Sequence, residues 1–500
     1  MTPTLIIYCV AAYFACLLGI AWWTGRNSGM EGYFLGNRAS PWFAVAFGML
    51  GDSLSGVTYI SVPGEVLNGQ FSYFQLVLGY FAGYFIIGRI LLPLYYRMNL
   101  ISVYGYLETR FGTRSRKTGA VFFILSRLLG ASARLFLAAG VIQFFIFDRL
   151  WEGHGVPFWL SVSVIIILMV LYTFKGGIKT LVWTDAFQSL FLILGVVLSI
   201  AAIISYTGWG YEMAWEKLNH SNYTRIFFFD WHKASFFWKQ FLGGVFIAVA
   251  MTGLDQNMMQ KNLSCRSLKD AQKNMFWFSV VMVVVNVFFL ALGALLYLFM
   301  QDKGITLPLD AAGKVITDRV FPNLAFNHLG VIAGLVFILG LTAATFSSAD
   351  SVLTTLTTST AIDLLEIEKK PHWTEQKKRK WTTAIHILFA VLLWICILIF
   401  HEVNSGAVIK TVLLVAGYSY GPLLGLYSFG IFCRREMNDK WVPIVCLGAP
   451  LLTYFVVKGL VFLDYEVGNE LIIINGGVTW LLLFIGSTSE KRVLGVGLKN

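Results

Sequence analysis

A dense run of hydroxyl side chains lies inside one of the most apolar parts of the chain. Residues 342–360 read TAATFSSADSVLTTLTTST, and Ser347 and Ser351 share a helix face because they are four positions apart. Hydroxyls can bond back to helix carbonyls, but the density of this run exceeds that need. Hard cations such as sodium bind several oxygen atoms, which hydroxyls, carbonyls and carboxylates supply. The run therefore predicts a cation site; a structural role for the hydroxyls is the alternative.

A second polar interruption lies at residues 48–56, which read GMLGDSLSG. Glycines, serines and Asp52 are poor material for a continuous helix in the middle of an apolar span. Where a helix unwinds, its free carbonyls can line a polar cavity and hold a cation near the middle of the membrane. The segment predicts a broken helix; a packing face of small residues is the alternative.

Further ionisable residues lie within apolar spans, where each costs at least ~2.5–3.5 kcal/mol on insertion scales. Asp185 and Gln188 are neighbours on one helix face and indicate a second cation site or a cation exit; a carboxylate stabilised by a helix N-terminus is the alternative. Arg127 and Arg134 are seven residues apart and share a face. Arg134 is expected either to pair with a buried aspartate or to bind an anionic group of a solute.

Residues 251–253, MTG, form a second glycine-weakened point just before Asp255. Breaks at corresponding spans of two halves are typical of inverted-repeat transporters. Spans 42–62 and 236–258 would then each open a repeat of five spans.

The elements that position these residues follow from composition. The chain has 500 residues, of which 57% are hydrophobic and 13% charged, whereas soluble domains carry roughly 25% charged residues. The apolar residues fall in blocks of about 20, enough to cross a core of ~30 Å as helices. We therefore expect an all-α polytopic membrane protein, a single transporter domain over residues 1–500, with thirteen spans: about 4–23, 42–62, 72–98, 118–147, 157–174, 180–206, 236–258, 276–300, 327–365, 381–400, 407–433, 441–462 and 470–487.

Basic residues concentrate in alternate loops, most densely in residues 110–117, 261–273 and 369–380. Such asymmetry predicts that these loops are cytoplasmic, with the N-terminus outside and the C-terminus inside a cell inner membrane. The net charge of +11 is thus explained by orientation against membrane lipid, and no nucleic-acid partner is expected.

Four stretches carry a resemblance to a known family: 176–185, 255–260, 343–351 and 421–425. In these the chain resembles the sodium/solute symporter family, which includes proline, pantothenate, sialic acid, iodide and glucose symporters. The resemblance implies a LeuT-type core of two inverted five-helix repeats. On this scheme an extra N-terminal helix at 4–23 precedes a first repeat at about 42–206, a second at about 236–433 and C-terminal helices at about 441–487.

The resemblance also implies sites. The common sodium ion would be held by backbone carbonyls of Gly51, Leu54 and Ala344 and by the hydroxyls of Ser347 and Ser348. Members with a second sodium have an aspartate and two hydroxyl positions, which match Asp185, Asp350 and Ser351 here. The aspartate at 350 departs from the serine of the sialic acid symporters, which leaves stoichiometry, and sodium against proton binding, open. Substrate candidates are Ser53, Gly56, Thr58, Arg134, Gln143 and Tyr418.

Sodium-coupled symport of a small organic solute, carboxylate-bearing or sugar-like, is the predicted function, with the protein acting as a monomer. A proton-coupled symporter of the same fold is one alternative, and a channel or sensor is another, although no filter-like loop or signalling domain is evident. An enzyme is not expected: haem binding would need paired histidines in the membrane, and His386 alone lies clearly within a span.

Overall fold

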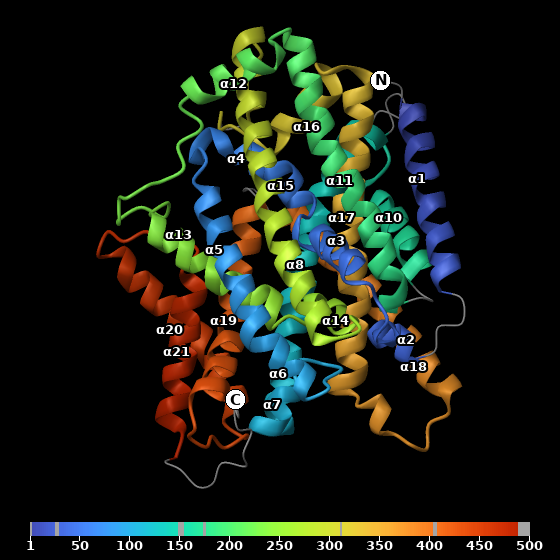
Figure 1. The fold of residues 1–500 in the computed structure, drawn as a ribbon, viewed down its shortest axis with the longest axis vertical. Coiled ribbons are helices and arrows are strands. Elements are labelled where there is room, and N and C mark those ends of the chain that lie inside the picture. Colours follow the sequence, from blue (N-terminus) through green and yellow to red (C-terminus); the bar gives the residue numbers. More distant parts are fainter. Residues whose placement is uncertain are drawn as a thin grey trace.

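The computed structural model describes residues 3–25, 30–148, 155–173, 177–310, 313–403 and 408–488, and over these residues the chain is helical, with isolated β-bridges and no strands. Figure 1 shows long helices running side by side along the longest axis. Eight helical stretches are long and apolar enough to cross a membrane. They are α1 (Pro3–Thr24), α5–η2–α6 (Tyr73–Ile86, Ile87–Leu91, Leu92–Arg97), α8 (Thr113–Ile142), α11 (Gly177–Thr207), α15 (Leu268–Lys303), α17–η6 (Gly330–Ser359, Thr360–Leu364), α18 (Glu375–Val403) and α20 (Val442–Val461).

Two further crossings are bent pairs of helices. α3 (Trp42–Ser53) and α4 (Gly56–Gly69) meet at 58°, and α13 (Phe237–Ala248) with η4 (Val249–Gly253) meets α14 (Gln256–Leu263) at 63°. Shorter apolar helices are α10 (Phe158–Thr173) and α21 (Leu471–Gly486), and α19 spans Val408–Phe432. Each of the thirteen predicted spans thus coincides with a helix or a bent pair, and both predicted breaks are confirmed.

The remaining short helices connect these crossings. They are α2 (Met30–Leu35), η1 (Gly36–Arg38), α7 (Gly105–Arg110), η3 (Gln143–Phe147), α12 (Gly210–His220), η5 (Thr317–Arg319), α16 (Val320–Asn327) and η7 (Ile367–Lys369). α12 and α16 lie at one end of the bundle and α7 at the other (Figure 1).

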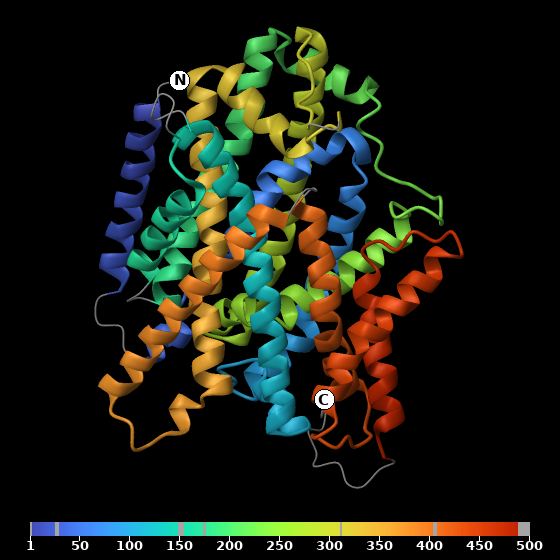
Figure 2. The ribbon, with the colours of Figure 1, turned by 180° about the vertical axis from the view of Figure 1, so that it is seen from behind.

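The helices of the two halves pack on each other in a reciprocal way. α13 packs against α5, and the broken pair α3 and α4 packs against α15. Likewise α17 packs against α11, while α8 packs against α19. The helices of the first half (α3 to α11) can be matched in chain order to those of the second half (α13 to α19), so that α5 corresponds to α15, α8 to α17 and α11 to α19. Under this matching the first contact of each pair becomes the second. From behind, α8 runs along the bundle between α18 and α19 (Figure 2).

The closest of these contacts depends on glycine. A Cβ on Gly79 of α5 would lie 2.1 Å from the carbonyl oxygen of Phe241, and a Cβ on Gly244 of α13 would lie 2.2 Å from that of Leu76. Small residues let two helix backbones touch, which gives α5 and α13 close packing without a hydrophobic driving force.

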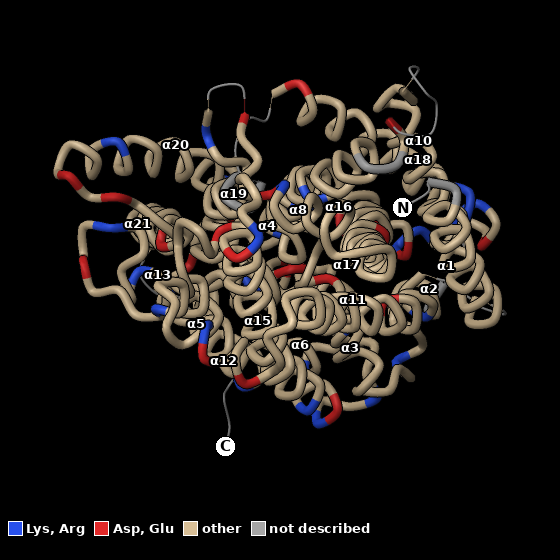
Figure 3. The backbone as a smooth tube through the Cα atoms, turned by 90° about the horizontal axis from the view of Figure 1, so that it is seen from above, with Lys and Arg blue, Asp and Glu red and all other residues tan. Residues whose placement is uncertain are grey.

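The outer faces carry large apolar side chains. Leu171 on α10, Leu388 on α18 and Phe455 on α20 are each more than half exposed, and Phe455 reaches 67%. Charged residues are sparse along the helices (Figure 3). Monomeric soluble proteins rarely expose apolar patches this extensive, so these faces are suited to lipid.

Candidate sodium and solute site

The break between α3 and α4 frees backbone oxygens in the middle of the bundle. α3 ends at Ser53, Leu54 leaves the helical conformation with ψ 68°, and α4 begins at Gly56. The Leu54 amide still donates to the Leu50 carbonyl at 2.7 Å. Because the helix stops there, the carbonyls from Gly51 onward have no partner within it.

The hydroxyl run of α17 faces this break. The Ser347 hydroxyl is fully buried and has no hydrogen-bond partner among the described residues. A Cβ on Gly51 would lie only 2.2 Å from that hydroxyl, so glycine is needed for the two helices to approach. The adjacent Ser348 hydroxyl donates to the Thr345 carbonyl at 3.0 Å.

Leu54 and Ala344, the other two predicted ligands, are fully buried on the same two packed segments. An unpartnered hydroxyl beside free carbonyls is the oxygen-rich environment that a hard cation needs. The residues predicted for the first sodium therefore fit the ion.

At the second predicted site, a positively charged side chain of the protein, Lys261, already contacts the carboxylate of Asp185. Asp185 on α11 accepts a hydrogen bond from the Ser351 hydroxyl at 2.9 Å, so two of the three residues that the resemblance implied for this site are in contact. The same Asp185 oxygen contacts the ammonium of Lys261, which also binds Asp52 at 2.5 Å. The side chains of Lys261 and Asp185 are fully buried.

A sodium ion on that Asp185 oxygen would lie beside the ammonium. Two unit charges 4 Å apart repel by about 4 kcal/mol at an effective dielectric constant of 20. The third predicted ligand, Asp350, has other partners, since it accepts hydrogen bonds from the Tyr172 hydroxyl at 2.7 Å and from the Ser351 amide at 2.5 Å. The residues of this second site therefore do not fit a sodium ion as they stand.

Lys261 is the buried charged residue that the sequence pattern misplaces. The pattern puts it at the start of a basic loop, 261–273, whereas it belongs to α14, a helix capped by Asp255, whose carboxylate accepts from the Met258 amide at 3.1 Å. The charge count of the apolar spans does not reveal this buried cation, because those spans also hold basic residues, among them Arg127, Arg134 and Lys239, that could pair with the buried aspartates.

Arg127 and Arg134 share a face of α8 but have different surroundings. Arg127 donates to Asp255 at 2.6 Å and to the Met251 carbonyl at 3.1 Å, and the Tyr420 hydroxyl donates to the same carboxylate at 2.5 Å. Arg134, by contrast, makes no hydrogen bond or ion pair with any other residue that the structure describes. The expected pairing with a buried aspartate is thus formed by Arg127, and Arg134 has a free guanidinium.

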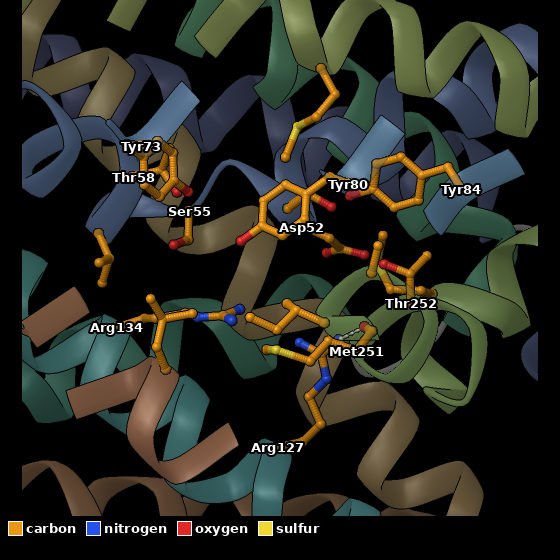
Figure 4. A pocket seen from close by; sticks show the side chains of 17 residues that line it. Asp52, Ser55, Thr58, Tyr73, Tyr80, Tyr84, Arg127, Arg134, Met251 and Thr252 are labelled. Carbon is orange, nitrogen blue, oxygen red and sulfur yellow. Dashed lines mark hydrogen bonds between the residues drawn. The ribbon is translucent and has the colours of Figure 1, made fainter. Parts of the chain in front are cut away.

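A pocket lies between the two helix breaks and α8, and the guanidinium of Arg134 lines it. In Figure 4 the Arg127 and Arg134 side chains point toward the space beneath Tyr80 and Asp52. The space is about 730 Å³, including a part open to solvent. It is lined by Asp52, Ser53, Ser55, Val57, Thr58, Tyr73, Tyr80, Tyr84, Arg127, Arg134, Ile247, Ala248, Met251, Thr252, Met258, Met282 and Leu413.

Of the six substrate candidates, Ser53, Thr58 and Arg134 line this pocket. The other three lie elsewhere in the described structure. Gly56 packs against Thr345 of α17, since a Cβ there would lie 2.5 Å from its hydroxyl. The Gln143 amide accepts from Ser161 and donates to the Val156 carbonyl. Tyr418 offers its carbonyl to Asn475.

Two bent spans, an oxygen-rich cradle for a cation and an adjoining pocket with a free guanidinium are features of a multi-pass membrane transporter. Residues 33–440 match the model of the sodium:solute symporter family. The chain belongs to this family.

The chain is similar to several curated members. It is 24% identical to sodium-coupled monocarboxylate transporter 2 of Mus musculus over 80% of this chain and 63% of that protein. It is also 24% identical to the sodium/sialic acid symporter of Aliivibrio fischeri, over 98% of this chain and 97% of that one. The human sodium/iodide cotransporter matches at 24% over 83% of this chain and 64% of its own length. The chain therefore spans somewhat less than two thirds of the two mammalian relatives.

Solved structures share the fold. The substrate-bound, outward-open state of a sodium-coupled sialic acid symporter superposes with a TM-score of 0.82 at 20% identity, covering 96% of this chain and 97% of that one. A nucleobase-cation-symport-1 family transporter in a closed conformation superposes with a TM-score of 0.57 at 15% identity, covering 92% and 95%. The predicted LeuT-type fold is confirmed.

Proposed function

We propose that the protein imports a small organic solute bearing a carboxylate, together with sodium. The observation that carries this proposal is the free guanidinium of Arg134 in the pocket beside the broken helix. A guanidinium binds a carboxylate through two parallel hydrogen bonds, which supplies both orientation and binding energy. A neutral sugar would leave the charge of Arg134 unpaired away from water, which is costly.

The other pocket residues suit a solute with an apolar part. Tyr73, Tyr80 and Tyr84 offer aromatic faces and hydroxyls, while Ser53 and Thr58 offer further hydrogen bonds. Pockets for small molecules are mostly apolar, with a few polar groups that fix orientation. Two of the relatives are named for carboxylates, a monocarboxylate and sialic acid, which supports the same solute class.

Sodium provides the free energy for uptake. A tenfold inward gradient is worth ~1.4 kcal/mol for each ion, enough for tenfold accumulation per sodium. For the setting we propose a monomer in a cell inner membrane, in contact with lipid, with the N-terminus outside, the C-terminus cytoplasmic and no enzymatic activity.

The test is uptake by purified protein in liposomes. Radiolabelled pyruvate, sialic acid, an amino acid and glucose are supplied with an inward sodium gradient or with potassium in its place. We expect a carboxylate to enter only with sodium. Arg134→Gln should then raise the KM for that solute by at least tenfold, because hydrogen bonds to charged groups contribute ~1.5–3 kcal/mol.

Arg134→Lys is the matched control, because it keeps the charge and loses the bidentate geometry, so it should fall between wild type and Arg134→Gln. The amide of the transported solute should be carried poorly by wild type and no worse by Arg134→Gln. Sodium-driven uptake of glucose alone, or an unchanged KM in Arg134→Gln, would refute the proposed solute class.

A further inference from the structure

The buried ammonium between α3, α11 and α14 has a consequence for the number of sodium ions. We propose that Lys261 takes the place of a second sodium ion, so that the protein binds one sodium, at the α3–α17 cradle, in each transport cycle. The inference rests on the proposed sodium-coupled function and defines its ion stoichiometry.

The first argument is that the ammonium occupies the contacts that a second ion would need. Lys261 binds the Asp185 oxygen that also accepts the Ser351 hydroxyl, and Asp185 and Ser351 are two of the three residues expected to hold that ion. The ammonium brings the same single positive charge, and its second partner is Asp52 at 2.5 Å. A sodium ion would therefore have to displace a cation that is attached to the chain.

The second argument is that the ammonium cannot easily leave. α14 is held by bonds at several points: Gln260 donates to the Phe34 carbonyl at 2.6 Å, and Asn262 accepts from Asn274 at 2.7 Å. The Tyr96 hydroxyl also donates to the Asn262 carbonyl at 2.9 Å. With the helix fixed on both sides of Lys261, and with the side chain fully buried, removal of the ammonium would leave two buried carboxylates without a cation.

The third argument concerns Asp52, which belongs to both the pocket and the charge cluster. It lines the solute pocket, and it accepts from Lys261 and from Asn257, the latter at 3.2 Å. The attached cation thus supplies, without an ion from solution, the positive charge that stabilises an aspartate beside the solute. One consequence is electrical: one sodium and a singly charged carboxylate together carry no net charge across the membrane.

The experiment counts sodium ions on the purified protein in the absence of solute, by equilibrium binding of ²²Na⁺. Wild type should bind one sodium per molecule at saturation, and Ser347→Ala should bind it about tenfold more weakly or not at all. Two sodium ions on wild type, or wild-type sodium affinity in Ser347→Ala, would overturn the proposal. Because no solute is present, a wrong solute class leaves the count unchanged, whereas a count of zero refutes sodium coupling itself.

A gain-of-site variant provides an independent measurement. Lys261→Gln removes the ammonium and leaves Asp52 and Asp185 facing each other, so the sodium count should rise from one to two. Asp185→Asn in the Lys261→Gln background should return it to one. A folded Lys261→Gln protein that still binds a single sodium would contradict the assignment, and if this variant fails to fold, the wild-type and Ser347→Ala counts still decide.

Discussion

Ser347 illustrates how a buried side chain can lack a partner within the protein and still be explained. Its hydroxyl is fully enclosed and makes no hydrogen bond with the described residues, although most buried polar atoms are satisfied. Its neighbour across the helix contact is Gly51, which has no side chain to fill the space. A cation held between the serine and the carbonyls of the broken helix would satisfy the hydroxyl.

Replacement of this hydroxyl tests the first sodium site. Ser347→Ala removes one of five predicted oxygen ligands, so we expect sodium affinity to fall by about tenfold or more, which is about 1.4 kcal/mol. Sodium-dependent thermal stabilisation in detergent measures this, since a ligand that binds the folded state raises its stability by mass action.

The control for that measurement is Thr453→Ala on α20. The Thr453 hydroxyl is also buried in a helix and bonds to the Ala449 carbonyl at 2.8 Å, far along the chain from the cradle. It should keep the wild-type sodium response. Equal sodium responses in the two variants would exclude Ser347 as a ligand.

At the scale of elements, the two broken helices place polar and charged side chains at the pocket and in the buried ion pair. The α3–α4 break places Asp52 and Ser53 at the pocket, and the break before α14 places Asp255 against Arg127. The two bent pairs are themselves held by their neighbours, most closely where α13 meets α5 through Gly79 and Gly244. A small change in that contact should therefore propagate to the pocket.

Gly79→Ala tests this dependence. The added Cβ would lie 2.1 Å from the Phe241 carbonyl, so α5 and α13 must separate, and overpacking of this kind costs ~1–3 kcal/mol. We expect a lower melting temperature and weaker solute binding. Gly130→Ala on α8 is the control: nothing lies within 4 Å of its added Cβ, so the melting temperature should stay the same or rise slightly. Equal melting temperatures would show that the α5–α13 contact tolerates separation.

At the scale of the whole molecule, the reciprocal contacts of the two halves enclose the site. Because the pocket and the cradle lie between the halves, movement of one half against the other could expose them to either side of the membrane in turn. Such movement gives directional transport only if the orientation in the membrane is fixed, and the distribution of basic loops predicts which side is cytoplasmic.

Labelling of single cysteines tests that orientation. In a variant whose native cysteines are replaced, Glu212→Cys on α12 and Lys377→Cys on α18 each place a thiol at an exposed position near opposite ends. A membrane-impermeant maleimide applied to intact cells should label position 212 and reach position 377 only after permeabilisation. The reverse pattern would place the N-terminus inside.

Much of the fold could be read from local patterns. Each of the thirteen predicted apolar blocks coincides with a helix or a bent pair of helices, because the length of an apolar run is a property of neighbouring residues and the membrane tolerates little besides helices. The two breaks could be predicted for the same reason, since glycine and clustered polar residues weaken a helix wherever they occur.

The partners of the buried charges could not be predicted in this way. Arg127 and Arg134 share a helix face, and only the placement of Asp255, more than a hundred residues later, gives Arg127 an ion pair and leaves Arg134 without one. Lys261 looks like one of many basic loop residues until the turn at Asp255 brings α14 against α3 and α11. The sequence by itself determined the crossings, the breaks and the oxygen-rich helix; the tertiary structure decided which charges meet, because that depends on distances between segments far apart in the chain.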